Sequence, residues 1–405
     1  MKDVVIVSAV RTPFGKFDGV MKNTSSIELG VAALKEVIQR INLSPAEVDE
    51  IYYGTCIPAE YAIYTNVPAR QISLLAGFPA DTISLTIDRA CCSSMTALRL
   101  CVQSINAGQA EIAIASGAES MGNTALLAAA SQVRWGNRLG PVQLEDVLFE
   151  LGYSSTGFAP VARDAGEVAL EFGISRSLQD EWALMSQSRW QEAYRAGRFK
   201  VGEEIMPLEL PQKKGNSIVL DKDESPRPDT SLEKLAKLKP IYGSPTVTAG
   251  NAPGMNSGAA AIVVTTREKA LEKGLMPLAS VKSVACAAGE PRYMACVPAQ
   301  AIQKILRNTG LSIDEMELVE INEAFAAVTL VSLKMLAGDD KDRQRRLAEK
   351  TNVNGGAIAI GHPVGASGAR ITMTLMYELR RRGGGLGVAA ICGGLSQGEA
   401  VILEV

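Results

Sequence analysis

Few residues of this chain could perform nucleophilic or acid-base chemistry near neutral pH. His362, the only histidine in 405 residues, lies among glycines in the segment AIGHPVGASG. Cys91 and Cys92 stand directly before a predicted helix that opens with serines, in RACCSSMTAL (89–98). Cys392 ends an apolar run and is followed by two glycines. These residue types offer a thiol nucleophile, an imidazole that moves protons, and a second thiol that can serve as acid or base.

Each of these residues also has a structural interpretation. A thiol at a helix N-terminus meets the positive end of the helix dipole, which favours thiolate, whereas the alternative for Cys91 and its neighbour is a buried pair of small residues. A lone histidine is more often structural, and Cys392 taken alone would be a core cysteine. Asn322 and Glu323, in INEAFAAV (321–328), stand where a predicted strand runs into a helix, and helix capping is their alternative role.

The composition is that of a folded globular protein. Hydrophobic residues make up 47% of the chain, and 44 acidic against 41 basic residues give a net charge of −3. This balance leaves no excess of positive charge of the kind that indicates binding to nucleic acid or to an anionic membrane. No run approaches the roughly 18 apolar residues of a membrane span. We therefore expect no nucleic acid partner and no membrane span.

The seven cysteines indicate the compartment. They are odd in number, and the start of the chain, MKDVVIVSAVRTPFG, has the pattern of a first strand rather than of a signal peptide. Both features favour reduced thiols in a cytoplasmic compartment over a disulfide framework. The cysteines outside the motifs above are expected to be buried small apolar residues: Cys56, Cys101, Cys286 and Cys296.

A weak internal repeat organises the chain. ALKEVIQRINLSPAEVDEIYYG (33–54) has the helical pattern, turn and apolar strand of AIQKILRNTGLSIDEMELVEIN (301–322). In a second pair, 93–120 and 367–394, small residues open a helix, glycine closes it and a short apolar strand follows. This pairing places His362 roughly where Cys91 stands in the other half. The pattern predicts two similar α/β halves whose sheets are largely parallel and covered on both faces.

The segment from about 120 to 246 has no counterpart in the second half. It is rich in helix formers and then in charge. We expect an insertion on the first half, placed where it could cover a site at the strand ends. A merely structural helical subdomain is the alternative.

The chain resembles the thiolase family along essentially its whole length. The resemblance is carried by VVIVSAVRTPFGKFDG, the C-x-S-x-M segment at Cys91, TVTAGNAPGMNSGAAAIVV (246–264), NEAFA (322–326), NVNGGAIAIGHPVGASGAR (352–370) and the final C-x-G at Cys392. It implies a thiolase-like α/β fold in which two similar halves form a layered αβαβα core. The implied domains are an N-terminal half (1–119 plus 247–270), an inserted loop domain (120–246) and a C-terminal half (271–405).

The same resemblance implies a role for each reactive residue. Cys91 aligns with the nucleophile that becomes acylated, and His362 with the base that activates it. Asn322 would fix a water that, with His362, holds the thioester oxygen, and Cys392 would be the second acid/base. The backbone N–H groups of Cys91 and Gly394 would form a second oxyanion site. The residues expected to contact CoA or substrate are Arg227, Ala249, Pro253 and Phe325.

The reaction that the resemblance implies is CoA-dependent acyl transfer. A 3-oxoacyl-CoA is cleaved to acetyl-CoA and a shortened acyl-CoA, or the Claisen condensation runs in reverse, through an acyl-Cys91 intermediate. Coenzyme A is then a substrate, and no metal or redox cofactor is required. The family likeness also suggests a role in fatty acid metabolism and β-oxidation, and a homodimer or homotetramer.

Four departures from the family pattern leave the acyl-chain preference open. Ser94 replaces a glycine near the nucleophile, and Pro253 replaces a serine that contacts the pantetheine arm in the family. The glycine run after Cys392 is shortened and continues as Leu395 and Ser396. The histidine and methionine of the family's loop-domain motif are missing from FAPVARDAGEVA (158–169).

Two other functions are compatible with this pattern. A ketosynthase-like condensing enzyme could use a cysteine with one histidine and one asparagine, although the terminal C-x-G at Cys392 favours a thiolase. A catalytically altered thiolase-like protein could bind acyl-CoA or act as a scaffold. The presence of all four reactive positions argues against that scaffold.

Overall fold

The computed structural model describes residues 2–57, 66–135, 139–149, 153, 156–211 and 216–405. Its centre is a ten-stranded sheet in which nine strands follow the order β12-β13-β14-β11-β1-β10-β5-β3-β4, and β2 pairs with β10. The strands are β1 (Val4–Arg11), β2 (Gly15–Lys16), β3 (Glu50–Gly54), β4 (Ile83–Ile87), β5 (Ile112–Ser120), β10 (Asn256–Thr266), β11 (Ala279–Ala288), β12 (Leu318–Ile321), β13 (Leu386–Gly393) and β14 (Gln397–Glu404).

The two ends of this sheet repeat one arrangement. On one side β3 runs parallel to β5, β5 is antiparallel to β10, and β10 is antiparallel to β1. On the other side β12 runs parallel to β13, β13 is antiparallel to β14, and β14 is antiparallel to β11. The halves join where Val5 and Ile6 of β1 pair with Ser280 and Ala279 of β11. The expectation of two similar α/β halves is confirmed.

The expectation of largely parallel sheets is wrong. The parallel pairs are β3 with β4, β3 with β5, and β12 with β13, and the other pairs of the large sheet are antiparallel. The apolar runs in the sequence predicted strands that are buried on both faces, and β10 is such a strand because every one of its residues is buried. Burial of this kind does not depend on strand direction, so the pattern could not distinguish the two pairings.

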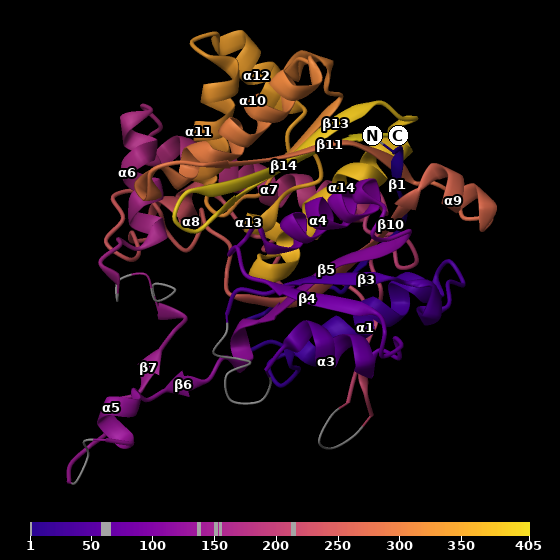
Figure 1. Cartoon of the computed structure of the whole chain (residues 1–405). Coiled ribbons are helices and arrows are strands. Elements are labelled where there is room, and N and C mark those ends of the chain that lie inside the picture. Colours follow the sequence, from indigo (N-terminus) through magenta and orange to yellow (C-terminus); the bar gives the residue numbers. More distant parts are fainter. Residues whose placement is uncertain (1, 58–65, 136–138, 150–152, 154–155, 212–215) are drawn as a thin grey trace.

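Helices fill three layers around the two halves of the sheet (Figure 1). In the middle layer α4 (Ser93–Ala107) packs against α14 (Ser367–Arg382). One outer layer holds α1 (Ser26–Gln39) and α3 (Pro68–Leu75), and the other holds α10 (Val297–Thr309), α11 (Ala326–Ala337) and α12 (Lys341–Glu349). The thiolase-like layered αβαβα fold is thereby present, with α9 (Arg267–Glu272) and α13 (Ala357–Ile360) in its connections.

Matching caps support the repeat that the sequence indicates. The short helical turns Pro45–Glu47 and Ile313–Glu315 each begin with a serine capping box, at Ser44 and Ser312. In each box the serine and a glutamate three residues later satisfy each other's backbone N–H groups. In the second pair of segments, α4 precedes β5 and α14 precedes β13, and glycines close both helices. The repeated elements are therefore α4 and α14, which meet at the centre of the molecule.

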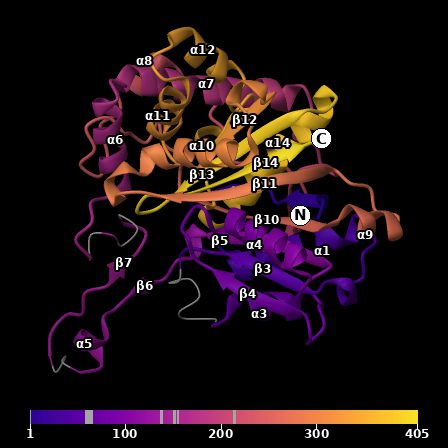
Figure 2. The same ribbon diagram turned by 45° about the horizontal axis from the view of Figure 1, so that its top comes forward.

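Between β5 and β10 the chain leaves the sheet. It forms β6 (Leu126–Leu127), α5 (Ala130–Val133), β7 (Glu145–Asp146), α6 (Val161–Glu171), α7 (Arg176–Arg195), β8 (Leu208–Leu210), β9 (Ile218–Leu220) and α8 (Leu232–Ala236). Figure 2 shows β6, α5 and β7 on an arm that extends away from the body. The helices α6 and α7 instead pack against α11 of the second half. The domain boundaries given above remain a prediction.

All seven cysteines are free thiols in the structure. Cys101 and Cys296 are buried as expected, but Cys56 and Cys286 are only half-buried, so the expectation is wrong for those two. A cysteine's apolar character does not reveal whether its strand or loop borders solvent. No helix in the described ranges is long and apolar enough to cross a membrane.

Candidate active site

Cys91 stands at the junction between β4 and α4. The residue before it, Ala90, adopts a left-handed backbone with φ of 49°, a conformation that costs an alanine roughly 1 kcal/mol. The side chain is half-buried and lines a cavity of about 880 Å³. Burial raises the pKa of the Cys91 thiol well above its ordinary value, and the nearby Cys392 raises it further. Desolvation of the thiol therefore opposes the stabilisation of a thiolate that a helix N-terminus offers.

His362 faces this thiol directly. Its Nε2 lies 3.3 Å from Cys91 Sγ, and its Nδ1 lies 2.6 Å from Ser367 Oγ. The Ser367 hydroxyl donates its one hydrogen to the carbonyl of Pro363 at 2.8 Å. Ser367 must then accept from Nδ1–H, which leaves Nε2 as a lone-pair acceptor toward the thiol. Asn256 Oδ1 fixes the backbone by accepting from His362 N at 2.9 Å.

The surroundings of His362 keep its imidazole neutral. The side chain is 7% exposed. Burial, together with the positive charge of Arg370, lowers the pKa of His362 to about 3. A neutral imidazole with a free Nε2 lone pair can accept the proton of a neutral thiol.

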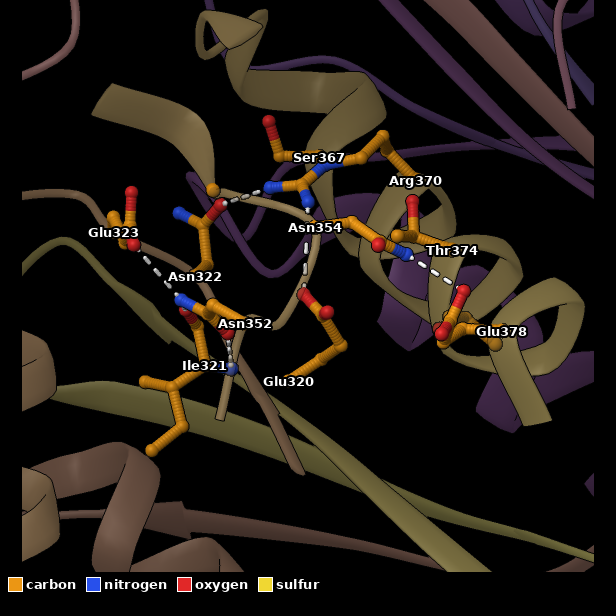
Figure 3. Close-up of polar contacts among 12 residues, drawn as sticks. Glu320, Ile321, Asn322, Glu323, Asn352, Asn354, Ser367, Arg370, Thr374 and Glu378 are labelled. Atoms are coloured by element: carbon orange, nitrogen blue, oxygen red, sulfur yellow. Dashed lines mark hydrogen bonds and ion pairs between the residues drawn. The ribbon is translucent and has the colours of Figure 1, made fainter. Parts of the chain in front are cut away.

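Asn322 lies next to the same ring nitrogen. Its Nδ2 is 3.4 Å from His362 Nε2, and its Oδ1 accepts from Arg370 Nη2 at 3.2 Å. Figure 3 shows the Arg370 guanidinium facing both Asn322 and Glu320. The backbone N–H of Asn322 donates to Ala390 on β13, so the neighbouring strand sets its position. The capping alternative is not what the structure shows, because α11 begins only at Ala326.

Glu323, beside Asn322, has a structural position. Its carboxylate accepts from Trp182 Nε1 at 2.9 Å and from Ser186 Oγ at 2.7 Å, both on α7, and from Asn352 Nδ2 at 3.0 Å. The Ile358 N–H donates to it as well, at 3.1 Å. Glu323 thus ties the inserted helix α7 to the segment that leads to His362.

Cys392 is the penultimate residue of β13 (Leu386–Gly393) and is fully buried. Burial raises the pKa of its thiol to about 12, so the resting group holds its proton. Gly394 follows in the turn to β14 and lines the cavity. A Cβ at Gly394 would collide with the Tyr153 hydroxyl, which explains why glycine is needed there. The next two residues, Leu395 and Ser396, adopt positive φ of 56° and 60°.

The cavity that Cys91 and His362 line also contains the residues that the sequence predicts for CoA or substrate binding. All four residues predicted to contact CoA or substrate line it: Arg227, Ala249, Pro253 and Phe325. Arg227 Nη1 donates to the carbonyl of Ala249 at 3.2 Å. The inserted segment contributes to the wall through residues such as Leu148 and Tyr153, so it does cover the site. In the described part of the chain no group of three acidic, cysteine or histidine side chains is placed to hold a metal ion.

The departure at Ser94 has a structural explanation. This buried serine lies in the first turn of α4, and its Oγ accepts from Ala369 N of α14 at 2.9 Å. The hydroxyl therefore links the two central helices. Pro253 stays in the cavity wall although it has no N–H to donate.

Sequence reasoning missed three residues at this site. Ser367 holds His362 Nδ1, Arg370 holds Asn322, and Cys56 lines the cavity with its Sγ 3.2 Å from Glu119 Oε2. Ser367 and Arg370 lie within the GASGAR run that was recognised. They are three residues apart on one helix, so they share a face, and this spacing could have identified both.

Comparisons with known proteins agree with this architecture. Residues 4–268 match the family model described as "Thiolase, N-terminal domain", and residues 275–405 match "Thiolase, C-terminal domain". An acetyl-CoA acetyltransferase from Allochromatium vinosum is 40% identical over 405 residues, which is 100% of this chain and 99% of the relative. Two solved structures share 38% identity and a TM-score of 0.91, and in each case the match covers 100% of this chain and 99% of theirs. They are the human mitochondrial 3-ketoacyl-CoA thiolase and the Bacillus anthracis acetyl-CoA acetyltransferase. The chain belongs to the thiolase family.

Proposed function

We propose that the protein is a thiolase that transfers acyl groups to and from coenzyme A. The reaction is the cleavage of a 3-oxoacyl-CoA by CoA to acetyl-CoA and a shortened acyl-CoA, or its reverse. The observation that carries this proposal is the contact of 3.3 Å between His362 Nε2 and Cys91 Sγ at the wall of a cavity of about 880 Å³. The acetyl-CoA acetyltransferases and 3-ketoacyl-CoA thiolase that the chain resembles support the same substrates.

In the first half of the reaction Cys91 is the nucleophile. His362 Nε2 takes the thiol proton as Sγ attacks the 3-keto carbon of the substrate. The bond between the second and third carbons then breaks, and its electron pair leaves on acetyl-CoA as an enolate. The shortened acyl group remains on Cys91 as a thioester.

Cys392 then moves the second proton. Its thiol, whose pKa burial raises to about 12, keeps its proton until a strong base such as the enolate forms. Donation completes acetyl-CoA and leaves a thiolate, which deprotonates incoming CoA. The CoA sulfur attacks the acyl-Cys91 thioester, Cys91 leaves as thiolate, and His362 returns its proton.

Developing negative charge requires donors in both steps. Protonated His362, together with a water bound by Asn322, would hold one thioester oxygen; Asn322 Nδ2 lies 3.4 Å from His362 Nε2. The backbone N–H groups of Cys91 and Gly394 would hold the oxygen of the substrate's reacting carbonyl. Both residues line the cavity.

The other two functions are less well supported. A ketosynthase-like enzyme would not need the second thiol of Cys392 at the end of β13, and both matching family models are thiolase models. A scaffold would not need an imidazole tautomer fixed by Ser367 opposite a thiol. Coenzyme A acts as a substrate, and we propose that no resident cofactor takes part.

We also propose that the protein works in the cytoplasm as a homodimer or homotetramer. The seven free thiols support a reducing compartment. The edge strand β4 exposes Ile83 (63%) and Leu85 (47%), an apolar edge that proteins normally cover. The arm that carries β6, α5 and β7 has further exposed apolar residues, among them Leu126, Trp135 and Leu139.

The test is a thiolysis assay with CoA and a series of 3-oxoacyl-CoA esters that starts at acetoacetyl-CoA. We expect acetyl-CoA to form with the wild type, and malonyl donors to be inactive. Cys91→Ser and His362→Ala should each lower the rate at least about 10³-fold, because a nucleophile or its base is lost. Cys286→Ser, at a half-buried thiol on β11, is the matched control and should keep the wild-type rate. A Cys91→Ser enzyme at full rate would remove the proposed nucleophile.

A further inference from the structure

We propose that Arg370 is a positioning residue for this reaction, because its guanidinium fixes the side-chain amide of Asn322 with the NH₂ group toward His362. The positioning role assigned to Arg370 rests on the thiolase activity proposed above. It rests on the buried polar contacts of Figure 3 for its geometry.

The donor pattern of Arg370 determines which way the amide points. Arg370 Nη2 lies 3.2 Å from Asn322 Oδ1, and a guanidinium has only donors. The amide oxygen must therefore face Arg370. The NH₂ group is left on the opposite side, 3.4 Å from His362 Nε2. A flipped amide would place a second acceptor beside the Nε2 lone pair and would remove the donor from that side of the ring.

One helix fixes both partners of the histidine. Ser367 and Arg370 are three residues apart on α14, so they lie on the same face. Ser367 orients the ring through Nδ1, and Arg370 orients Asn322 beside Nε2. The first turn of α14 thereby sets the tautomer of the base and the direction of the adjacent donor together.

The cost of burying Arg370 argues against a purely structural role. The side chain is 0% exposed, and its nearest acid, Glu320, lies 3.8 Å away, beyond hydrogen-bond distance. Within the described residues, Nε and Nη1 of Arg370 and Oε2 of Glu320 have no hydrogen-bond partner. A structural buried arginine is normally paired in the bidentate geometry that offsets its desolvation. The contact with Asn322 is the hydrogen bond that this guanidinium makes.

The charge of Arg370 has a second effect on the base. It adds to burial in lowering the pKa of His362, which keeps Nε2 free to accept a proton. Cys91 is the titratable group that contacts His362 on its other side. The charged groups that act on Arg370 itself come from several elements: Glu320 and Glu323 at the end of β12, Glu204 in the inserted segment, and Arg11 at the end of β1.

The experiment combines a double-mutant cycle with nuclear magnetic resonance of the single histidine. The thiolysis kcat is measured for wild type, Arg370→Gln, Asn322→Ala and the double variant. We expect each single change to lower kcat about 10- to 100-fold, with KM for CoA little changed. The double variant should be no worse than Asn322→Ala, because Arg370 acts through Asn322. Additive losses would overturn the proposal.

His362 gives a readout that does not depend on turnover. With isotope-labelled histidine, Arg370→Gln should move the titration midpoint of His362 upward, toward the ordinary value, by about one pH unit or more. An unchanged midpoint would overturn the proposal even if thiolysis were lost. If instead the wild type proved inactive while the midpoint moved, the proposed function would fail and the contact would stand.

Arg370→Lys covers the case in which Arg370→Gln does not fold. It keeps the charge and a donor but loses the planar fork. We expect a low His362 midpoint, a kcat between those of wild type and Asn322→Ala, and a normal unfolding transition. A kcat as low as that of Asn322→Ala together with a raised midpoint would count against the assigned role.

Discussion

Burial determines the resting protonation state of the reactive side chains at this site. The thiols of Cys91 and Cys392 both have raised pKa values, and the imidazole of His362 has a lowered one. All three are therefore neutral before substrate binds, which suits groups withdrawn from water. In the proposed reaction, Cys91 becomes a thiolate only when His362 takes its proton. Desolvation raises the pKa of the Cys91 thiol by more than a backbone hydrogen bond at Cys91 lowers it.

His362 should make the protein less stable in acid. Its folded pKa of about 3 lies below its ordinary value of 6.5, so below pH 6.5 the unfolded chain takes up a proton that the folded chain does not. The stability is complete above about pH 6.5 and is lost as pH falls from there. Between pH 7 and pH 5 the loss should be about 2 kcal/mol, at about 1.4 kcal/mol per pKa unit. Denaturant unfolding at the two pH values measures it.

The control for this prediction is His362→Gln. Because the chain has no other histidine, the variant should lose this part of the acid sensitivity and keep the part that comes from carboxylates. The difference between the two proteins then isolates His362. Equal losses of stability in wild type and variant would show that the imidazole is not buried in its neutral form.

Two repeated helices bring the reactive residues together. Cys91 lies two residues before the first residue of α4, and His362 lies five residues before the first residue of α14. The helices approach closely at Gly368, where an added Cβ would lie 2.5 Å from Met95 N on α4. Close packing of backbone against backbone thus sets the separation of thiol and imidazole.

Gly368→Ala should separate the catalytic pair. The methyl group cannot be accommodated without moving α14 away from α4, because the atom it meets belongs to the backbone. Overpacking of this kind costs about 1–3 kcal/mol, and a displacement of about 1 Å can lower a rate about 100-fold. Thermal unfolding and the thiolysis kcat are the measurements.

Gly122→Ala is the matched control. The nearest atom to its added Cβ lies at 3.8 Å, which is ordinary contact, so stability and rate should be close to those of the wild type. If Gly368→Ala behaved in the same way, the spacing of α4 and α14 would not control the contact between His362 and Cys91.

At the scale of the molecule, the sequence predicted some features better than others. The repeat and the two similar halves were predictable from helical periodicity, which is a local signal. The layered fold and the pairing of Cys91 with His362 were implied by the resemblance to the thiolase family. Strand direction was not predictable, since β10 and β14 are apolar whichever way they run. The contact of Arg370 with Asn322 was also missed. It joins residues 48 positions apart, and only the assembled halves place them together.

The edge of the large sheet leads to a prediction about assembly. β4 pairs only with β3 in the described structure, and Ile83 and Leu85 project from it on one face. An apolar edge left open would invite aggregation, so a second copy of the chain is its expected cover. Wild type should therefore be a dimer or tetramer by light scattering. The double variant Ile83→Lys/Leu85→Lys should shift toward smaller species, because two buried charges would oppose each other across the interface.

Leu271→Lys provides the comparison that makes this result specific. Leu271 lies on α9 and is 67% exposed, so the same apolar-to-lysine change there should leave the oligomer intact. The Leu271→Lys protein should also unfold near the wild-type temperature, because exposed substitutions usually change stability by less than about 0.5 kcal/mol. An unchanged mass for the double variant would place the interface elsewhere on the molecule. A monomeric wild type would refute the assembly itself, while thiolysis by that monomer would show that each chain holds a complete site.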